Sequence, residues 1–273
     1  MESDTVGKRL KGKPAKAEHS EAVPPRRRNA VNLLELAYER LEHLIVTCEL
    51  RPGAFLTIQD IQNICGFGRT PVHQAVTRLA TDTLVIIRPR HGLMIAPIDL
   101  ARERLLLTLR RDLERFVVRL AAERSSPARR SQMLHLSRQL RVRRDTMSIS
   151  EFNGLDRRID QLILAAADEP FLEHTLRPLH TIFRRIGWIF HNRTSGHSNI
   201  AETVDSHLSV LEAVAGRNVE RAIDSSDALV DFVERMFDII ECEVDPAVLD
   251  STVEPLLPDD PAARAAVIDQ SIG

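Results

Sequence analysis

The chain has few cysteines, few aromatic residues and no long apolar run. Its 273 residues include three cysteines, one tryptophan and one tyrosine. Cys48, Cys65 and Cys242 have neither paired spacing nor a histidine cluster nearby, which argues against a disulfide framework or a zinc finger. No apolar stretch approaches the roughly 20 residues of a membrane-spanning helix, and the first residues lack a secretory signal. We therefore expect a cytoplasmic protein without a membrane partner.

Charge is unevenly distributed along the chain, although the formal net charge is only −2. Residues 1–30 carry eight basic and four acidic side chains, and residues 245–273 carry six acidic side chains and one basic one. Phosphates respond to local charge, so the small total is compatible with DNA binding. We expect a disordered basic arm over 1–30, which either contacts DNA or stays solvated, and a disordered acidic tail over 245–273.

A glycine turn followed by a short helix is the most informative pattern. After Gly66 and Gly68, Pro71 falls in the first helical turn, where its missing N–H costs nothing. Helical spacing gives this segment one apolar face, formed by Val72, Ala75, Val76 and Leu79. The other face carries polar, partly cationic side chains, namely Arg69, His73, Gln74 and Arg78.

The neighbouring segments predict the rest of a DNA-binding module. Residues 57–64 have the capping-box spacing of a short helix that ends at Gly66, so the two helices form a helix-turn-helix. Residues 84–87 and 93–96 favour strands, and the basic segment 88–92 between them favours a hairpin tip. A helix suited to the major groove beside a basic hairpin indicates a winged helix-turn-helix.

Three separated motifs, at 49–53, 68–75 and 88–92, occur in an order typical of one DNA-binding family. They resemble the N-terminal domain of GntR-family bacterial transcription regulators. This family usually has serine before the arginine of the second motif, where this chain has Gly68. The resemblance implies a DNA-binding domain over 31–97 and double-stranded operator DNA as its partner.

Individual DNA contacts follow from the chemistry of the side chains. We expect Arg69 to bind guanine with two hydrogen bonds, Gln74 to contact adenine, and Thr70 to contact a phosphate at the helix start. Arg78 either joins them or extends past Leu79 into solvent. The full predicted set is Arg69, Thr70, His73, Gln74 and Arg78 on the helix, with Arg88, Arg90, His91 and Gly92 on the hairpin.

Long helical patterns replace these short elements after residue 98. Short breaks separate six candidate helices, at 99–124, 127–147, 150–167, 170–193, 199–216 and 218–242. Helices joined by short connections form an all-α bundle. The predicted fold class is therefore mainly α, with an N-terminal winged helix-turn-helix and its small β-hairpin wing followed by a helical bundle.

The bundle is similar to the FCD-type effector domain of the FadR-like GntR subfamily. The resemblance rests on residues 110–114, on Leu155 with Asp156, and on 205–208. It implies an effector-binding and dimerisation domain over 98–244. The implied partners are a second copy of the chain and a small-molecule effector, often a carboxylate in this family.

Many members of that subfamily hold a divalent metal on an aspartate, a histidine four residues later and two further histidines. Carried over to this sequence, the positions are Asp156, Asp160 in place of histidine, His207, and Leu229 in place of the last histidine. Asp156, Asp160 and His207 would suit a weak, oxygen-preferring ion such as Mn²⁺ or Mg²⁺. By ligand count we expect loss of the metal instead, with His207 a hydrogen-bonded core histidine and no cofactor.

Without a metal, effector binding falls to cations and hydrogen-bond donors. Arg110 suits a carboxylate, or it pairs with Glu114 four residues later. Trp188 lies either in the core or beside the ligand. Two aspartates would repel an acid unless a cation neutralises them, so a neutral or cationic effector stays an alternative. The predicted effector-binding set is Arg110, Asp156, Asp160, Arg184, Trp188, His191 and His207.

These patterns predict a ligand-responsive transcriptional regulator that represses from a near-palindromic operator as a dimer. A ligand in the bundle would change the placement of the two winged helices and release DNA. One alternative is an architectural DNA-binding protein without an effector. The other is an all-α metal-dependent enzyme, but the sequence has no nucleophile elbow and no glycine-rich phosphate loop. We predict that the chain is not an enzyme.

Overall fold

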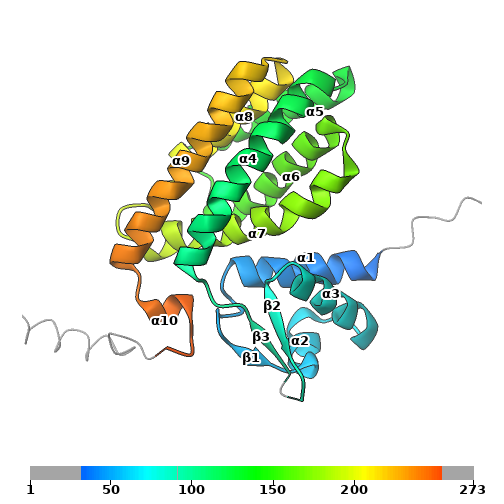
Figure 1. Cartoon of the computed structure of the whole chain (residues 1–273), viewed down its shortest axis with the longest axis vertical. Coiled ribbons are helices and arrows are strands. Elements are labelled where there is room, and N and C mark those ends of the chain that lie inside the picture. The colour runs from blue at the N-terminus through cyan, green and yellow to red at the C-terminus, as the bar shows by residue number, and fades with distance from the viewer. Residues whose placement is uncertain (1–31, 91, 254–273) are drawn as a thin grey trace, which may run out of the picture. The chain divides into compact units, whose positions relative to one another are not determined.

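Short helices and short strands make up the first part of the structure, and long helices make up the rest (Figure 1). The computed structural model describes residues 32–90 and 92–253. The first part contains α1 (Leu33–Val46), β1 (Phe55–Leu56), α2 (Ile58–Cys65), α3 (Arg69–Thr81), β2 (Val85–Arg88) and β3 (Gly92–Ile95). The second contains α4 (Leu100–Arg124), α5 (Pro127–Arg143), α6 (Ile149–Ala167), α7 (Pro170–Arg193), α8 (Ala201–Ala215), α9 (Val219–Glu243) and α10 (Pro246–Leu249).

Local hydrogen bonds define the helix-turn-helix formed by α2 and α3. Thr57 Oγ1 accepts from the Asp60 N–H at 3.1 Å, and the Asp60 carboxylate accepts from the Thr57 N–H at 2.8 Å. This capping box starts α2. Gly66 ends the helix with a φ of 75°, a left-handed conformation that glycine adopts without strain. Helix α2 therefore begins and ends where the sequence places it.

The wing is an antiparallel sheet with strand order β1-β3-β2. The predicted hairpin is present, and β2 pairs with β3 from Val85 opposite Ile95 to Arg88 opposite Gly92. The short strand β1, in which Phe55 pairs with Met94, was not predicted. The fold class is confirmed: a mainly helical chain in which a winged helix-turn-helix with a small sheet precedes a helical bundle.

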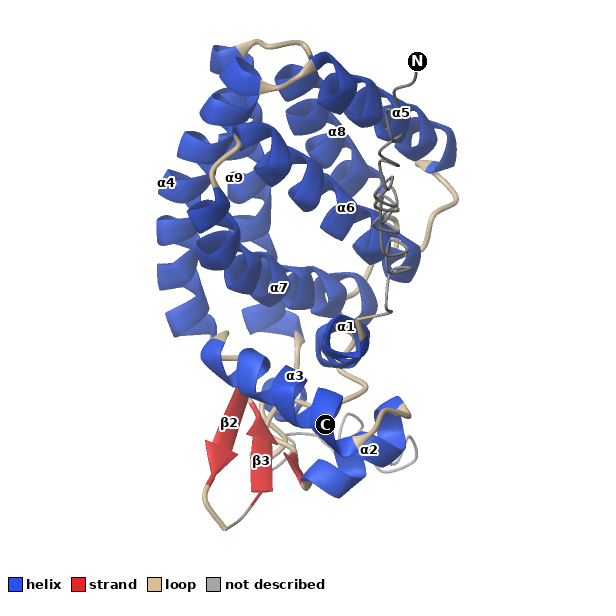
Figure 2. Ribbon diagram, turned by 90° about the vertical axis from the view of Figure 1, so that its right-hand side faces the viewer, coloured by secondary structure: helices blue, strands red, loops and turns tan. Residues whose placement is uncertain are grey.

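Helix α1 contributes to the core of the winged helix and also contacts the bundle. Its buried residues Tyr38, Leu41 and Ile45 share one apolar cluster with Val72 of α3. Ile182 of α7 belongs to the same cluster, so α7 packs directly against this domain (Figure 2). Apolar burial at this contact favours a defined arrangement of α1 and α7.

The six bundle helices correspond to the six predicted ones, with shifted ends. Helix α4 packs along α9 and α6, while α8 packs against α9 and α5. Their apolar faces form a second large core cluster that includes Phe152, Phe183 and Phe237. Among the residues that the structure describes, no helix is both long and apolar enough to cross a membrane.

The beginning of the expected acidic tail is ordered, which corrects the prediction of disorder from residue 245. Residues 245–253 include α10, and Leu249 is buried in the bundle core cluster. The Leu249 carbonyl accepts from the Ile98 N–H at 2.8 Å, and the Pro52 carbonyl accepts from the Ser251 N–H at 2.9 Å. These backbone hydrogen bonds and apolar contacts order a segment whose acidic, proline-containing composition by itself favours disorder. The arm over 1–30 and residues 254–273 lie outside the described residues.

Candidate functional site

Helix α3 presents its polar face to solvent. Arg69, Thr70, His73 and Gln74 are exposed in its first two turns, while its apolar face is buried in the core. Gly68, the N-cap, offers no side-chain hydrogen bond to the first N–H groups of the helix. Those N–H groups and the helix dipole favour an anion such as a phosphate. The arrangement is suited to reading base edges with a helix anchored at its N-terminus.

Arg78 differs from the other predicted contacts because it is half-buried and held by α1. Its Nη1 donates to Glu35 Oε2 at 2.8 Å, and its guanidinium lies 4.1 Å from the centre of the Tyr38 ring. Tyr38 in turn donates from its hydroxyl to Asp82 at 2.9 Å. Arg78 therefore connects α3 to α1, and its role in DNA contact stays a prediction.

On the wing, Arg88 and Arg90 are exposed at the hairpin tip. Gly92 has a backbone role, because its φ is 89° and a Cβ there would lie 2.5 Å from the Leu56 carbonyl oxygen. Only glycine fits this close approach without strain. His91, also predicted to contact DNA, lies outside the described residues.

Six of the seven predicted effector residues line one small cavity inside the bundle, with a volume of about 40 Å³. They come from four helices, α4, α6, α7 and α8. The seventh, Trp188, is half-buried against the bundle core and does not line the cavity. The six lining residues are Arg110, Asp156, Asp160, Arg184, His191 and His207.

Arg184 lies at the centre of a buried ion network beside this cavity. Its Nε donates to Asp156 Oδ2 at 2.9 Å, and its Nη2 donates to Asp160 Oδ2 at 2.7 Å. Its Nη1 donates to Glu42 Oε1 at 3.3 Å, on helix α1. Each nitrogen of the guanidinium therefore binds a carboxylate, and charge-assisted hydrogen bonds of this kind are among the strongest in proteins.

His180 extends the network toward α4. Its Nε2 lies 2.7 Å from Glu114 Oε1 and its Nδ1 lies 3.2 Å from Asp160 Oδ2. Burial alone would lower the pKa of His180, but Asp160 and Glu114 outweigh it and raise the pKa. Burial alone would raise the pKa of Glu114, but His180 and Arg110 lower it to about 2. Arg110 and Glu114 form the predicted i, i+4 pair, at 3.2 Å.

Two further histidines line the cavity. His207 Nδ1 lies 2.7 Å from the Thr203 carbonyl oxygen, to which it donates, and Nε2 lies 3.1 Å from Asp156 Oδ1. Burial alone would raise the pKa of Asp156, but His207 and Arg184 hold it well below its usual value. His191 is satisfied by the His197 carbonyl and the Thr203 hydroxyl, and burial lowers its pKa.

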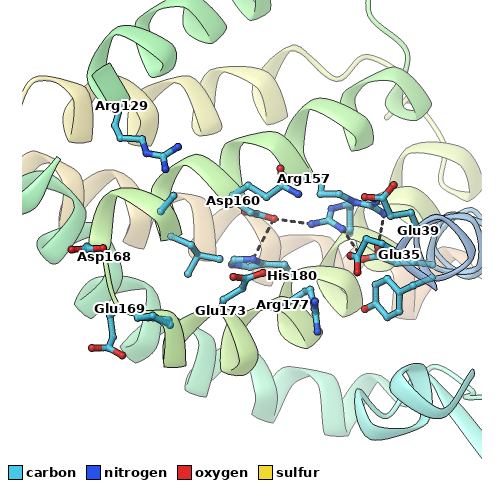
Figure 3. A pocket seen from close by; sticks show the side chains of 17 residues that line it. Glu35, Glu39, Arg129, Arg157, Asp160, Asp168, Glu169, Glu173, Arg177 and His180 are labelled. Atoms are coloured by element: carbon cyan, nitrogen blue, oxygen red, sulfur yellow. Dashed lines mark hydrogen bonds and ion pairs between the residues drawn. The ribbon is translucent and has the colours of Figure 1, made fainter. Parts of the chain in front are cut away.

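A larger cleft of about 420 Å³ lies between α1, α6 and α7 on the other side of the network (Figure 3). It shares Asp160, His180 and Arg184 with the inner cavity. Asp160 and His180 face each other where the cleft meets the ion network, and Glu35 and Glu39 of α1 lie to one side of them (Figure 3). The ion network therefore separates the inner cavity from a cleft that borders the winged helix.

Comparison with known protein families matches both parts of the chain. Residues 33–95 match the bacterial regulatory proteins of the gntR family, and residues 105–232 match the FCD domain. The chain belongs to the GntR family. Together with the FCD domain, the match makes it a DNA-binding transcriptional regulator, and members of this family are not enzymes.

Similar proteins agree with this assignment. The GntR regulator is 26% identical over 189 residues to the HTH-type transcriptional repressor RspR of Escherichia coli K12, covering 68% of this chain and 82% of RspR. An HTH-type regulator of Streptomyces ambofaciens is 25% identical over 206 residues, covering 75% and 83% of the two chains. The same fold occurs in E. coli McbR/YncC, with a TM-score of 0.66, 18% identity and coverage of 77% and 98%.

The metal positions of the subfamily have an unfavourable donor set in this GntR regulator. Arg184 hydrogen-bonds to a carboxylate oxygen of both Asp156 and Asp160, and Leu229 lines the cavity without a donor atom. Across residues 32–90 and 92–253, no group of three or more His, Cys, Asp or Glu side chains is arranged to hold a metal ion. As arranged here, these residues do not fit a divalent ion.

Several members of the network were absent from the predicted site, among them Glu42, His180 and Arg157. Glu42 is buried on α1, where it accepts from Arg157 and from the Thr181 hydroxyl. Its place between Leu41 and Leu44 on an apolar face was a signal, because a buried carboxylate requires a partner. His180 lies four residues before Arg184 and so shares its helix face. No comparable signal in the sequence pointed to Arg157.

Proposed function

We propose that this GntR regulator is a repressor that binds a near-palindromic operator as a homodimer and leaves it when a small metabolite binds the FCD bundle. The observation that carries the proposal is the exposed polar face of α3, with Arg69, Thr70, His73 and Gln74 on one side of a helix whose other side is buried. Arginine and glutamine in the major groove discriminate guanine and adenine through paired hydrogen bonds.

An exposed apolar face of α4 supports the homodimer. The side chains of Leu105, Leu109 and Phe116 are 72%, 50% and 41% exposed, and their spacing places them on one side of the helix. Contiguous exposed apolar surface on a soluble protein marks an interaction site. Two-fold pairing of this face would present two winged helices to two half-sites.

The inner cavity supports a small polar effector bound without a metal. Asn153, which lines the cavity and is only 7% exposed, has no hydrogen-bond partner for its Nδ2 among the described residues. A buried donor without a partner costs free energy, which a ligand or water acceptor would recover. With Arg110 and Arg184 beside this amide, we propose a small carboxylate as the effector.

The test of DNA reading is an Arg69→Ala variant assayed on the operator that wild-type protein selects from genomic fragments. Loss of one bidentate guanine contact, worth about 1–3 kcal/mol, should lower the ratio of specific to non-specific affinity by about fivefold or more. Arg138→Ala removes an exposed arginine from α5 in the bundle and should leave the ratio unchanged. An unchanged ratio in a folded Arg69→Ala protein would contradict the assignment of α3 as the recognition helix.

The effector is tested by thermal unfolding of the full chain with a panel of small carboxylates. A ligand that binds only the native state at about 100 times its Kd stabilises the protein by about 2.7 kcal/mol. A stabilising carboxylate should also weaken operator binding. The architectural alternative predicts no such ligand and no change in operator affinity.

A further inference from the structure

We propose that Arg184 is a built-in cation that replaces the divalent metal of metal-binding FCD domains and, unlike a metal ion, joins the effector cavity directly to helix α1 of the DNA-binding domain. The effect on DNA binding through α1 rests on the proposed function. The replacement of the metal by Arg184 does not depend on DNA binding.

The first step is the position of the guanidinium. Asp156 and Asp160, one helical turn apart on α6, both accept from Arg184, and His207 approaches the other oxygen of Asp156 at 3.1 Å. The Arg184 side chain is only 6% exposed. Two of the three side chains that would face a metal ion therefore bind a protein cation, and the third, His207, binds one of these two.

The second step is that the departures from the subfamily's ligand pattern become consistent with one another. A carboxylate at position 160 accepts a hydrogen bond from Arg184, which a neutral histidine would do less strongly. Leu229 lies where a fourth ligand would be needed, and a guanidinium needs none there. The planar fork of arginine is suited to bridging carboxylates, so one arginine compensates for both altered positions.

The third step is the remaining nitrogen of Arg184. Its Nη1 donates to Glu42, which is 3% exposed on α1 and 142 residues away in the sequence. Glu42 is also bound by the Thr181 hydroxyl at 2.5 Å and by Arg157. One residue away from Glu42, Leu41 packs in the core that supports α3. A single side chain thus contacts both the effector cavity and the helix on which the recognition helix is mounted.

This arrangement indicates how a carboxylate effector would act. An acid that enters the cavity and accepts from Arg184 competes with Glu42 for the guanidinium. Removal of that hydrogen bond leaves a buried carboxylate on α1 with fewer partners, which is costly. The effector would therefore favour arrangements in which α1 has moved away from α7, and its differential affinity would set the size of the shift.

The replacement is tested by metal binding to full-length protein. After treatment with a chelator, wild-type protein should take up no stoichiometric Mn²⁺ or Zn²⁺, and neither ion should change its melting temperature. Arg184→Ala exposes Asp156, Asp160 and His207, and should bind about one ion per chain and be stabilised by it. Adding Leu229→His should raise the affinity further. Arg157→Ala, which removes an arginine paired with Glu42 and Glu39 of α1, should gain no metal.

Two results would overturn the replacement. One is stoichiometric, stabilising metal binding by the wild-type protein. The other is failure of Arg184→Ala, with or without Leu229→His, to bind either ion. If Arg184→Ala is unfolded in chelator, added Zn²⁺ or Mn²⁺ should restore its helical circular dichroism, and no restoration would also overturn the idea.

The link to α1 is tested by amide hydrogen exchange without DNA. Glu42→Gln and Arg184→Ala should each speed exchange in α1 several-fold relative to α8. Arg115→Ala removes an ion pair between α4 and Asp227 of α9 and should not change α1 relative to α8. Unchanged relative exchange in α1 would overturn the link. A wild-type protein that binds no specific DNA would instead overturn the proposed function and leave these results standing.

Discussion

Glu103 of α4 is a buried carboxyl group without a full set of hydrogen bonds. It is 3% exposed, and its Oε2 has no hydrogen-bond partner in the described part of the chain. Burial raises the pKa of Glu103 to about 8. Arg185 of α7, also buried, donates from Nη1 to the Ala96 carbonyl at 2.9 Å, and burial lowers its pKa. Glu103 thus carries a proton at neutral pH in the native state.

The raised pKa makes stability depend on pH in a defined direction. In the unfolded chain Glu103 loses its proton near pH 4.5, whereas in the native state it does so at about 8. The native state holds the extra proton in this window, so the free energy of unfolding falls as pH rises through it, by at most about 1.4 kcal/mol per pH unit. Glu103→Gln removes this dependence, and denaturant unfolding at several pH values between the two pKa values measures it.

A matched control is Glu123→Gln, which changes an exposed glutamate near the other end of α4. Its unfolding free energy should follow the wild-type pH dependence. A constant difference between wild-type protein and Glu103→Gln across the window would contradict the raised pKa of Glu103.

Among the elements, the wing depends on one glycine at the start of β3. Gly92 has a φ of 89°, and a Cβ there would lie 2.5 Å from the Leu56 carbonyl oxygen of β1. Gly66 also has a positive φ, 75°, but a Cβ at that position has open space around it. Alanine at Gly66 would therefore add backbone strain alone, whereas alanine at Gly92 would add both backbone strain and a steric clash.

We expect Gly92→Ala to destabilise the protein by about 2 kcal/mol or more, and Gly66→Ala by about 1 kcal/mol, because only the first adds a clash to the cost of a left-handed alanine. Denaturant unfolding measures both values. Operator affinity should fall in Gly92→Ala, since the displaced tip carries Arg88 and Arg90. A larger loss of stability in Gly66→Ala would contradict this account of the wing.

At the scale of the whole molecule, the exposed apolar face of α4 predicts how two copies associate. Leu105→Glu combined with Leu109→Glu places charges on that face, and in a two-fold interface each substitution acts twice. We expect the variant to be monomeric in sedimentation experiments and to bind the operator more weakly, because the half-sites are then bound independently. The native bundle should persist, since both leucines are exposed.

Val142→Glu on α5 is the control for this prediction, because Val142 is 85% exposed but lies on another helix. It should leave the oligomeric state unchanged. A dimer that survives the α4 substitutions would place the interface elsewhere, and a monomeric wild-type protein would contradict the homodimer.

Local chemistry in the sequence was sufficient for the helix-turn-helix, the hairpin and the six bundle helices. Thr57 with Asp60 starts α2, Gly66 ends it and Gly92 permits the wing. Caps, turns and helical periods involve residues a few positions apart, so their physics is visible in a linear sequence. The motifs built on these elements were also sufficient for the GntR family and its FCD domain.

Contacts between segments far apart in the sequence form only where two helix faces pack together. Which faces meet cannot be inferred from residues that are neighbours in the sequence. Glu42 and Arg184 are 142 residues apart, and nothing near Arg184 indicates its partner on α1. The same reason applies to β1, which exists only by pairing with β3, and to residues 245–253, which are ordered by Leu249 in the core. Folding thus gave Arg184 three carboxylate partners and held Arg78 against α1, because side-chain roles follow from neighbours that only packing brings together.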